Sequence, residues 1–250
     1  MPDRQSKLQA FDRFLQSVQT RYQPDLLFIA CNTLSVLYQD ARFDRYRHLP
    51  IEGIVETSVQ RLLQAFAREN NLAFIVFATP TTIEEAVYGK RLREHGVPAA
   101  QLAGQACPGL PDAISNDGSG RLAQQLLGEF VPAALEQFEI PPPKVLAFLG
   151  CTHYGYQARL FEQALRPRVP KAAVLNPNQA AADAIIARLR GEPGPGSLKI
   201  RFVSRYVIPE IVINSLSGYI GGKAPATLAA LKDFEHLPGL CGELAARVST

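Results

Sequence analysis

The chain has 250 residues, 47% apolar and 20% charged, an ordinary balance for a globular protein of one large domain or two small ones. Its net charge of +3, with no long run of lysine and arginine, argues against a nucleic-acid-binding protein. No apolar stretch reaches the roughly 18–20 residues that span a bilayer, and the polar start is unlike a signal peptide, so we expect a cytoplasmic protein without a membrane partner.

Helical and extended segments alternate along most of the chain. Apolar spacing predicts helices at 7–22, 33–38, 57–69, 83–95, 122–138, 157–165 and 178–189. Short apolar runs predict strands at 25–30, 50–54, 72–77, 101–106, 144–149, 173–175 and 198–204. Strands that alternate with helices are typical of βαβ units, so the predicted fold class is α/β, with mainly parallel sheets flanked by helices.

Small, polar and thiol residues gather where three of the predicted strands end. The three segments are Cys31-Asn32-Thr33, Thr79-Pro80-Thr81-Thr82 and Cys151-Thr152-His153. In open parallel sheets, ligands bind beyond the carboxyl ends of the strands. We therefore expect the functional site to be built from these three segments.

Two of the four cysteines share one context. Cys31 and Cys151 lie 120 residues apart, and each follows an apolar strand and precedes two polar residues. A strand-to-helix turn favours an anion such as a thiolate. Two thiols on opposite faces of one carbon are suited to removing a proton from one face and returning one to the other, which inverts that carbon. Cys107 and Cys241 are expected to be structural. No zinc spacing and no nucleotide-binding motif appears, so neither metal nor cofactor is expected.

These segments resemble the signature strings of glutamate racemases, within the aspartate/glutamate racemase family. The strings are Ala30-Cys31-Asn32-Thr33 and Gly150-Cys151-Thr152-His153-Tyr154. The segments Gly53-Ile54-Val55-Glu56, Ala78-Thr79-Pro80-Thr81-Thr82-Ile83 and Ala106-Cys107-Pro108 also resemble family segments, and Tyr88 follows the threonine loop at a familiar interval. The resemblance extends from about Ser6 to at least Asp183.

The resemblance implies a cofactor-free and metal-free racemase that interconverts L- and D-glutamate for peptidoglycan synthesis. It implies catalytic roles for Cys31, Cys151 and His153, and substrate binding by Asn32, Thr33, Thr79, Thr82 and Thr152. The family fold implies two pseudo-symmetric lobes with the active site between them. The first would comprise 1–52 with 176–250, and the second 53–175. The expected partner is a small amino acid, and a homodimer stays open.

Several features depart from the family pattern. The family opens with a strand ending in Asp-Ser-Gly, which this sequence lacks, so we expect the natural protein to be longer. The family's acidic residue beyond Cys107-Pro108 corresponds to Ser115, and Asp117 takes that place only if the loop shifts by two residues. Gly155 stands where proline is common, and Leu34 replaces a usual alanine. Two alternatives therefore stay open: a family member that acts on aspartate, a hydantoin or another small acid, and a non-catalytic member that binds an acidic ligand or a partner.

Overall fold

The computed structural model describes residues 3–69, 71–188 and 197–241, which belong to two compact units. The larger unit comprises Phe28–Ala41 and Ile51–Glu192. The smaller unit comprises Met1–Leu27, Arg42–Pro50 and Pro193–Thr250. Residues 28–41, which contain the first cysteine string, thus group with the larger unit, and the lobe boundaries near 52 and 175 stay a prediction.

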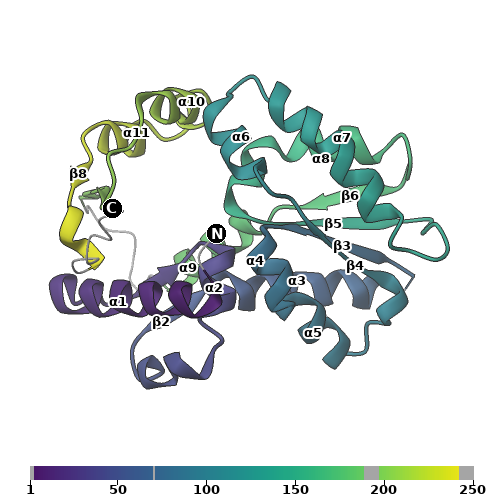
Figure 1. Cartoon of the computed structure of the whole chain (residues 1–250), viewed down its shortest axis with the longest axis horizontal. Helices are drawn as coiled ribbons and strands as arrows, with labels where there is room; N and C mark the ends of the chain where they lie inside the picture. Colours follow the sequence, from purple (N-terminus) through teal and green to yellow (C-terminus); the bar gives the residue numbers. More distant parts are fainter. Residues whose placement is uncertain (1–2, 70, 189–196, 242–250) are drawn as a thin grey trace, which may run out of the picture. The chain divides into compact units, whose positions relative to one another are not determined.

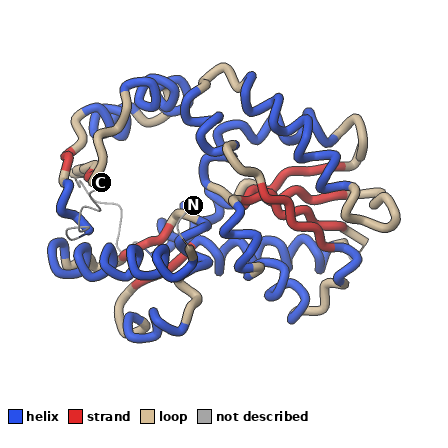
Figure 2. Tube along the Cα trace, in the orientation of Figure 1, coloured by secondary structure: helices blue, strands red, loops and turns tan. Residues whose placement is uncertain are grey.

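A four-stranded parallel sheet forms the centre of the larger unit (Figure 2). Its strand order is β4-β3-β5-β6, with bounds β3 Ala73–Ala78, β4 Leu102–Ala106, β5 Val145–Gly150 and β6 Ala172–Leu175. All of β3 is buried, which explains its unbroken apolar sequence. Ala78, the last residue of β3, pairs with Ala106 on one side and Gly150 on the other, so three strands end at the same level of the sheet.

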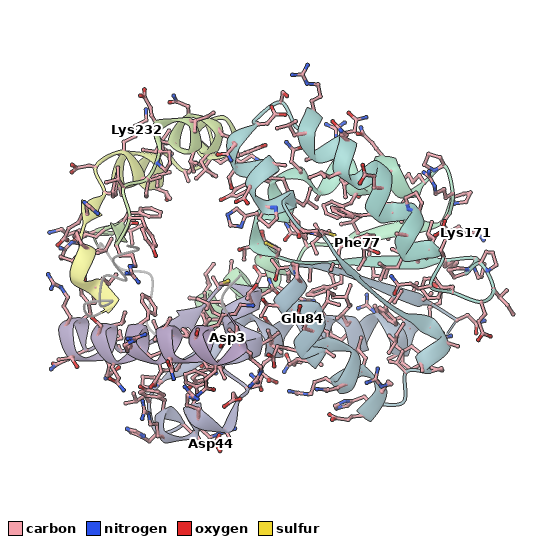
Figure 3. The ribbon with its side chains drawn as sticks, in the orientation of Figure 1. Asp3, Asp44, Phe77, Glu84, Lys171 and Lys232 are labelled. Atoms are coloured by element: carbon pink, nitrogen blue, oxygen red, sulfur yellow. The ribbon has the colours of Figure 1, made fainter. Side chains whose placement is uncertain are left out.

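Helices cover both faces of this sheet (Figure 1). The helices of the larger unit are α2 Asn32–Leu37, α3 Ile54–Arg68, α4 Pro80–Glu85, α5 Val87–Glu94, α6 Leu110–Asn116, α7 Arg121–Leu135, α8 Ala158–Leu165 and α9 Pro177–Arg188, with 3-10 turns η2 Ala99–Gln101 and η3 Thr152–Gln157. One core joins α6, α7 and α8 to a sheet face, and Phe77, labelled in Figure 3, meets Phe161 at a ring distance of 5.4 Å. A second core joins α3 and α5 to the other face. The predicted α/β class with helix-flanked parallel sheets is confirmed.

Two predicted elements differ from the structure, and one helix was not predicted. The helix expected over 83–95 breaks into α4 and α5 at Ala86, whose φ of 53° lies in the left-handed region. Residues 110–116 form α6, which the proline and the short polar residues of that segment concealed. The strand expected over 198–204 is reduced to β7, Val203–Ser204.

A second, two-stranded sheet pairs β1 Leu27–Ile29 with β2 Ile51–Gly53, and α2 follows β1 directly. Gly53 lies against the buried Ser35 of α2: a Cβ at Gly53 would meet Ser35 Oγ at 2.1 Å. Ser35 Oγ accepts a hydrogen bond from the Val55 amide, 3.2 Å away, at the start of α3. The position of α2 therefore depends on the absence of a side chain at residue 53.

We expect Gly53→Ala to lower the free energy of unfolding by roughly 2–3 kcal/mol, because the new methyl group overpacks a buried contact. Urea denaturation followed by circular dichroism measures this. The double variant Gly53→Ala/Ser35→Ala removes the opposing hydroxyl and should recover part of the loss. Equal stabilities of Gly53→Ala and the wild type would contradict the contact.

The smaller unit is mainly helical. Its elements are α1 Arg4–Tyr22, η1 Ala41–Tyr46, β7, α10 Glu210–Ile220, α11 Pro225–Lys232, β8 Glu235–His236 and η4 Pro238–Cys241. Asp3 caps α1 by accepting the Ser6 amide at 2.8 Å, and Phe11 of α1 packs on Phe43 at a ring distance of 5.2 Å. No helix in the described ranges combines the length and the apolar character that a bilayer span requires.

Candidate active site

The three predicted strand-end segments come together in the larger unit. Cys31 precedes α2, Thr79 precedes α4 and follows β3, and Cys151 precedes η3 and follows β5. The parallel strands β3 and β5 bring the second and third segments to the same edge of the sheet. The first segment follows β1 of the other sheet, and its Thr33 side chain is hydrogen-bonded to the threonine loop.

Three threonine hydroxyls form a closed ring, which we call the threonine triad: Thr33, Thr79 and Thr82. The Oγ1 atoms lie 2.8 Å apart between Thr33 and Thr79, 3.2 Å apart between Thr33 and Thr82, and 3.0 Å apart between Thr79 and Thr82. Thr79 Oγ1 also accepts the Thr82 amide at 3.4 Å and so caps α4. Each hydroxyl has one proton and two lone pairs, so a ring that uses its protons internally keeps lone pairs for an ammonium group.

Asn32 places a buried donor beside the triad. Only 1% of the residue is exposed, and its Oδ1 accepts a hydrogen bond from the Tyr88 hydroxyl. The Asn32 Nδ2 group is buried and has no hydrogen-bond partner among the described residues. Tyr88 packs against Phe148 in a tilted arrangement, with the ring centroids 4.7 Å apart. Buried polar groups are normally paired, so this amide is suited to donating to the carboxylate of a ligand.

The second thiol lies in a much drier setting. Cys151 is buried, and its Sγ lies 3.6 Å from Nδ1 of His153. Burial, together with the nearby charge of Cys31, raises the pKa of Cys151 to about 11. Burial also lowers the pKa of His153, although Asp112 opposes that shift, so at neutral pH a thiol faces an uncharged imidazole.

Cys31, in contrast, is exposed. Burial is the main cause that raises the pKa of both Cys151 and Tyr88, and the charge of Cys31 adds to it. Cys107 follows β4, is fully buried, and donates to the Gln105 carbonyl at 3.5 Å. Burial raises the pKa of the Cys107 thiol, as expected of a structural cysteine. The side chain of Cys241 lies outside the described part of the chain. In the described ranges no cluster of three His, Cys, Asp or Glu side chains is placed to hold a metal ion.

Polar residues after a fourth strand also reach the site, and the sequence patterns did not single them out. Asn178, two residues beyond the Asn176 that follows β6, donates from Nδ2 to the Thr152 carbonyl at 3.0 Å. A Cβ at Gly155 would lie 2.7 Å from Nδ2 of both Asn176 and Asn178. The absence of a side chain at Gly155 therefore leaves room for the amide groups of this asparagine pair. The signal was present in the sequence, because Asn176-Pro177-Asn178 follows a strand as the other segments do.

Asp117 and Ser115, the two positions that could correspond to the family's acidic residue, lie in different surroundings. Asp117 accepts the Ser119 and Leu122 amides, both at 3.0 Å, and so holds the start of α7. Ser115 lies partly buried in α6. Asp112, in the first turn of α6, is the carboxylate whose charge acts on His153, and no sequence motif indicated this residue.

We expect iodoacetamide to label the exposed Cys31 first at neutral pH, in a Cys241→Ser background. The thiolate is the reactive form, and both burial and the raised pKa keep Cys151 protonated. Labelling of Cys151 should rise only as the pH approaches 11. Peptide mass spectrometry measures each site, and urea-unfolded protein provides the control. Equal labelling rates for Cys31 and Cys151 in folded protein would contradict this difference.

The chain is similar to known proteins along most of its length. The family model for Asp/Glu/Hydantoin racemase matches residues 2–185. A glutamate racemase from Campylobacter jejuni is 31% identical over 156 residues, covering 61% of this chain and 55% of the relative. One from Ruegeria pomeroyi is 28% identical over 182 residues, covering 68% of this chain and 63% of the relative. The chain thus spans little more than half the length of the curated relatives it matches.

Solved structures share the fold. The glutamate racemase of Campylobacter jejuni aligns with a TM-score of 0.59 and 22% identity, over 87% of this chain and 81% of that chain. The glutamate racemase of Francisella tularensis in complex with D-glutamate aligns with a TM-score of 0.66 and 18% identity, over 95% of this chain and 83% of that chain. The resemblance drawn from the two cysteine strings is confirmed: the chain belongs to the Asp/Glu/Hydantoin racemase family.

Proposed function

We propose that this protein is a cofactor-independent racemase that interconverts L- and D-glutamate, with Cys31 and Cys151 as its two acid/base groups. One observation carries the proposal: the segment that contains Cys31 is hydrogen-bonded through Thr33 to the threonine loop at the end of β3, and Cys151 follows the neighbouring strand β5, so two strand-end thiols 120 residues apart in sequence accompany an unpartnered buried amide. The glutamate racemases among its relatives and structural neighbours support the same substrate.

The groups around the thiols complement an amino acid. Asn32 Nδ2 would donate to the α-carboxylate, and the threonine triad would accept from the α-ammonium group. Hydrogen bonds to the carboxylate stabilise the negative charge that spreads onto it when the α-proton leaves. Thr152, whose carbonyl is anchored by Asn178, would add a hydroxyl contact beside Cys151.

Inversion then needs only two proton transfers. A thiolate on one face removes the α-proton and becomes a thiol. The thiol on the opposite face gives its proton to the resulting carbanion and becomes a thiolate. The enzyme ends with its protonation pattern exchanged between the two sulfurs, ready for the reverse reaction.

The surroundings of Cys151 fit it for the acid role at the start of a cycle. Burial holds it as a thiol at neutral pH, while Cys31 is open to solvent. When the direction reverses, Cys151 has to lose its proton, and the neutral imidazole of His153, 3.6 Å away, is placed to interact with that sulfur. We therefore assign His153 to assisting Cys151.

Incubation of this chain with either enantiomer of glutamate in deuterium oxide tests the function. We expect both enantiomers to exchange the α-hydrogen and to approach an equal mixture, as followed by proton NMR and chiral chromatography. The absence of exchange at saturating glutamate would overturn the proposal, and it is the result that a non-catalytic member would give.

One departure from the family pattern favours a second substrate class. It is Gly155 of η3, which lies against Asn176 and Asn178. Aspartate, a hydantoin or another small acid would then exchange faster than glutamate in the same assay. With glutamate as substrate, we propose a cytoplasmic role in supplying D-glutamate for peptidoglycan. A homodimer stays a prediction.

A further inference from the structure

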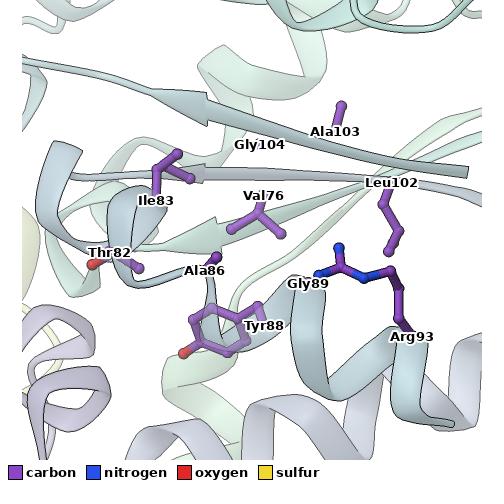
Figure 4. Close-up of a pocket in the computed structure, with 10 residues that line it drawn as sticks. All are labelled: Val76, Thr82, Ile83, Ala86, Tyr88, Gly89, Arg93, Leu102, Ala103 and Gly104. Carbon is purple, nitrogen blue, oxygen red and sulfur yellow. The ribbon is translucent and has the colours of Figure 1, made fainter. Parts of the chain in front are cut away.

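A pocket of about 160 Å³ lies behind the candidate active site, and we call it the rear pocket. Its apolar walls come from Val76 of β3, Ile83 of α4, and Leu102 with Ala103 of β4 (Figure 4). Gly104 of β4 also lines it, and a Cβ there would lie 3.6 Å from Ile83 Cδ1, an ordinary contact. A side chain at residue 104 would therefore occupy part of this space.

Two residues of the candidate active site also form part of the pocket wall. Thr82 and Tyr88 both line the rear pocket. Their polar ends are engaged elsewhere: the Thr82 hydroxyl belongs to the threonine triad, and the Tyr88 hydroxyl donates to Asn32. The rear pocket thus contacts the apolar parts of the same side chains that organise the substrate groups.

One cation borders the rear pocket. Figure 4 shows the stem of the Arg93 side chain below Leu102 and its guanidinium extending over Gly89. Arg93 forms no ion pair with any residue in the described ranges, whereas Arg91, on the same helix, forms a two-point ion pair with Glu56 at 3.0 and 3.1 Å. The apolar walls and the available guanidinium complement an apolar body that carries an anionic group.

We propose that the rear pocket binds a small carboxylic acid whose apolar body is about the size of one aromatic ring, and that this ligand acts on the candidate active site through Thr82 and Tyr88. The size follows from the volume, since an engineered apolar cavity of about 150 Å³ binds benzene. The binding claim stands alone, whereas the effect on catalysis depends on the proposed racemase function.

The junction between α4 and α5 connects the rear pocket to the candidate active site. Thr82 belongs to α4 and Tyr88 to α5, and the two helices meet at Ala86, which also lines the rear pocket. Ala86 has a φ of 53°, a conformation that a non-glycine residue adopts at some energetic cost. A ligand that contacts both helices at this junction changes the positions of the triad and of the Tyr88 hydroxyl together.

Calorimetric titration with benzoate, and with benzyl alcohol as its uncharged match, tests the binding claim. We expect one saturable benzoate site with millimolar affinity, which excess glutamate does not displace. Gly104→Val fills the space and should abolish binding of both probes, with Gly104→Ala intermediate. Arg93→Gln should weaken benzoate about fivefold and leave benzyl alcohol unchanged. Benzoate binding that is absent in the wild type, unchanged in Gly104→Val or displaced by glutamate would overturn the site.

The effect of benzoate on catalysis is measured separately, through the KM for glutamate. Benzoate should change the KM for glutamate at least twofold in the wild type and leave it unchanged in Gly104→Val. Unchanged wild-type kinetics in the presence of bound benzoate would overturn the coupling. A wild type that binds benzoate but shows no α-hydrogen exchange with any substrate would overturn the proposed function and leave the binding site in place.

Discussion

Cys31→Ala and Cys151→Ala are each expected to lower the rate of glutamate racemisation by about a thousandfold or more, because each removes one of the two proton-transfer groups. The two variants should differ in what remains. A single thiol can still remove and return a proton on its own face, so each variant should retain slow solvent exchange on one enantiomer only. The retained enantiomer should be opposite in the two variants. Chiral chromatography and NMR in deuterium oxide measure both quantities.

Cys107→Ala is the matched control, because Cys107 is a buried strand-end thiol whose hydrogen bond goes to the Gln105 carbonyl. It should racemise glutamate at a rate near that of the wild type. Wild-type racemisation by both single variants would reject the two-thiol assignment. Retained exchange of the same enantiomer by both would show that the two sulfurs do not face opposite sides of the substrate.

Asn32→Asp is expected to reduce kcat/KM for glutamate by about a thousandfold. The aspartate side chain has the same shape and keeps an oxygen for the Tyr88 hydroxyl, but it replaces the unpartnered Nδ2 donor with a charged acceptor. Loss of one donor to a developing anion costs about a hundred- to a thousandfold in rate, and repulsion between the two carboxylates adds to this. Initial rates of racemisation over a range of glutamate concentrations measure the change.

Two further variants distinguish the loss of the Asn32 hydrogen-bond donor from a change in the shape of the side chain. Asn32→Ala removes the donor without adding a charge and should lose less activity than Asn32→Asp. Tyr88→Phe leaves the amide present but without the hydroxyl that orients it, so we expect an intermediate loss. A thermal unfolding curve for each variant confirms that it is folded. Activity of Asn32→Asp equal to that of the wild type would contradict a carboxylate-binding role for this amide.

Local sequence patterns predicted the two central strands of the sheet well because these strands are buried on both sides. β3 and β5 appear as unbroken apolar runs, and they begin and end within one residue of their predicted bounds. The break at Ala86 was not predictable in this way, since alanine ordinarily favours a helix. What holds that break is long-range packing of α4 and α5 on the sheet, which no local pattern records.

The same distinction between local patterns and long-range packing applies to the residues of the candidate site. Residues placed by strand ends, such as Cys31, Thr79 and Cys151, could be selected from the sequence. The bond from Tyr88 to Asn32 joins residues 56 positions apart, and the contact of Asn178 with Thr152 spans 26, so neither follows from spacing. The dry setting of Cys151 likewise depends on the packing of α6 against η3.

The ring of three threonine hydroxyls has a consequence for stereochemistry. A hydroxyl hydrogen rotates about its C–O bond, so the three protons can circulate in either sense around the ring. The two senses point the lone pairs differently without moving a heavy atom. For the proposed racemase this matters, because mirror-image amino acids have equal free energies in solution and present the same ammonium group along different directions. A rotatable hydrogen-bond acceptor can bind the ammonium group of both enantiomers, whereas a fixed dipole would favour one enantiomer.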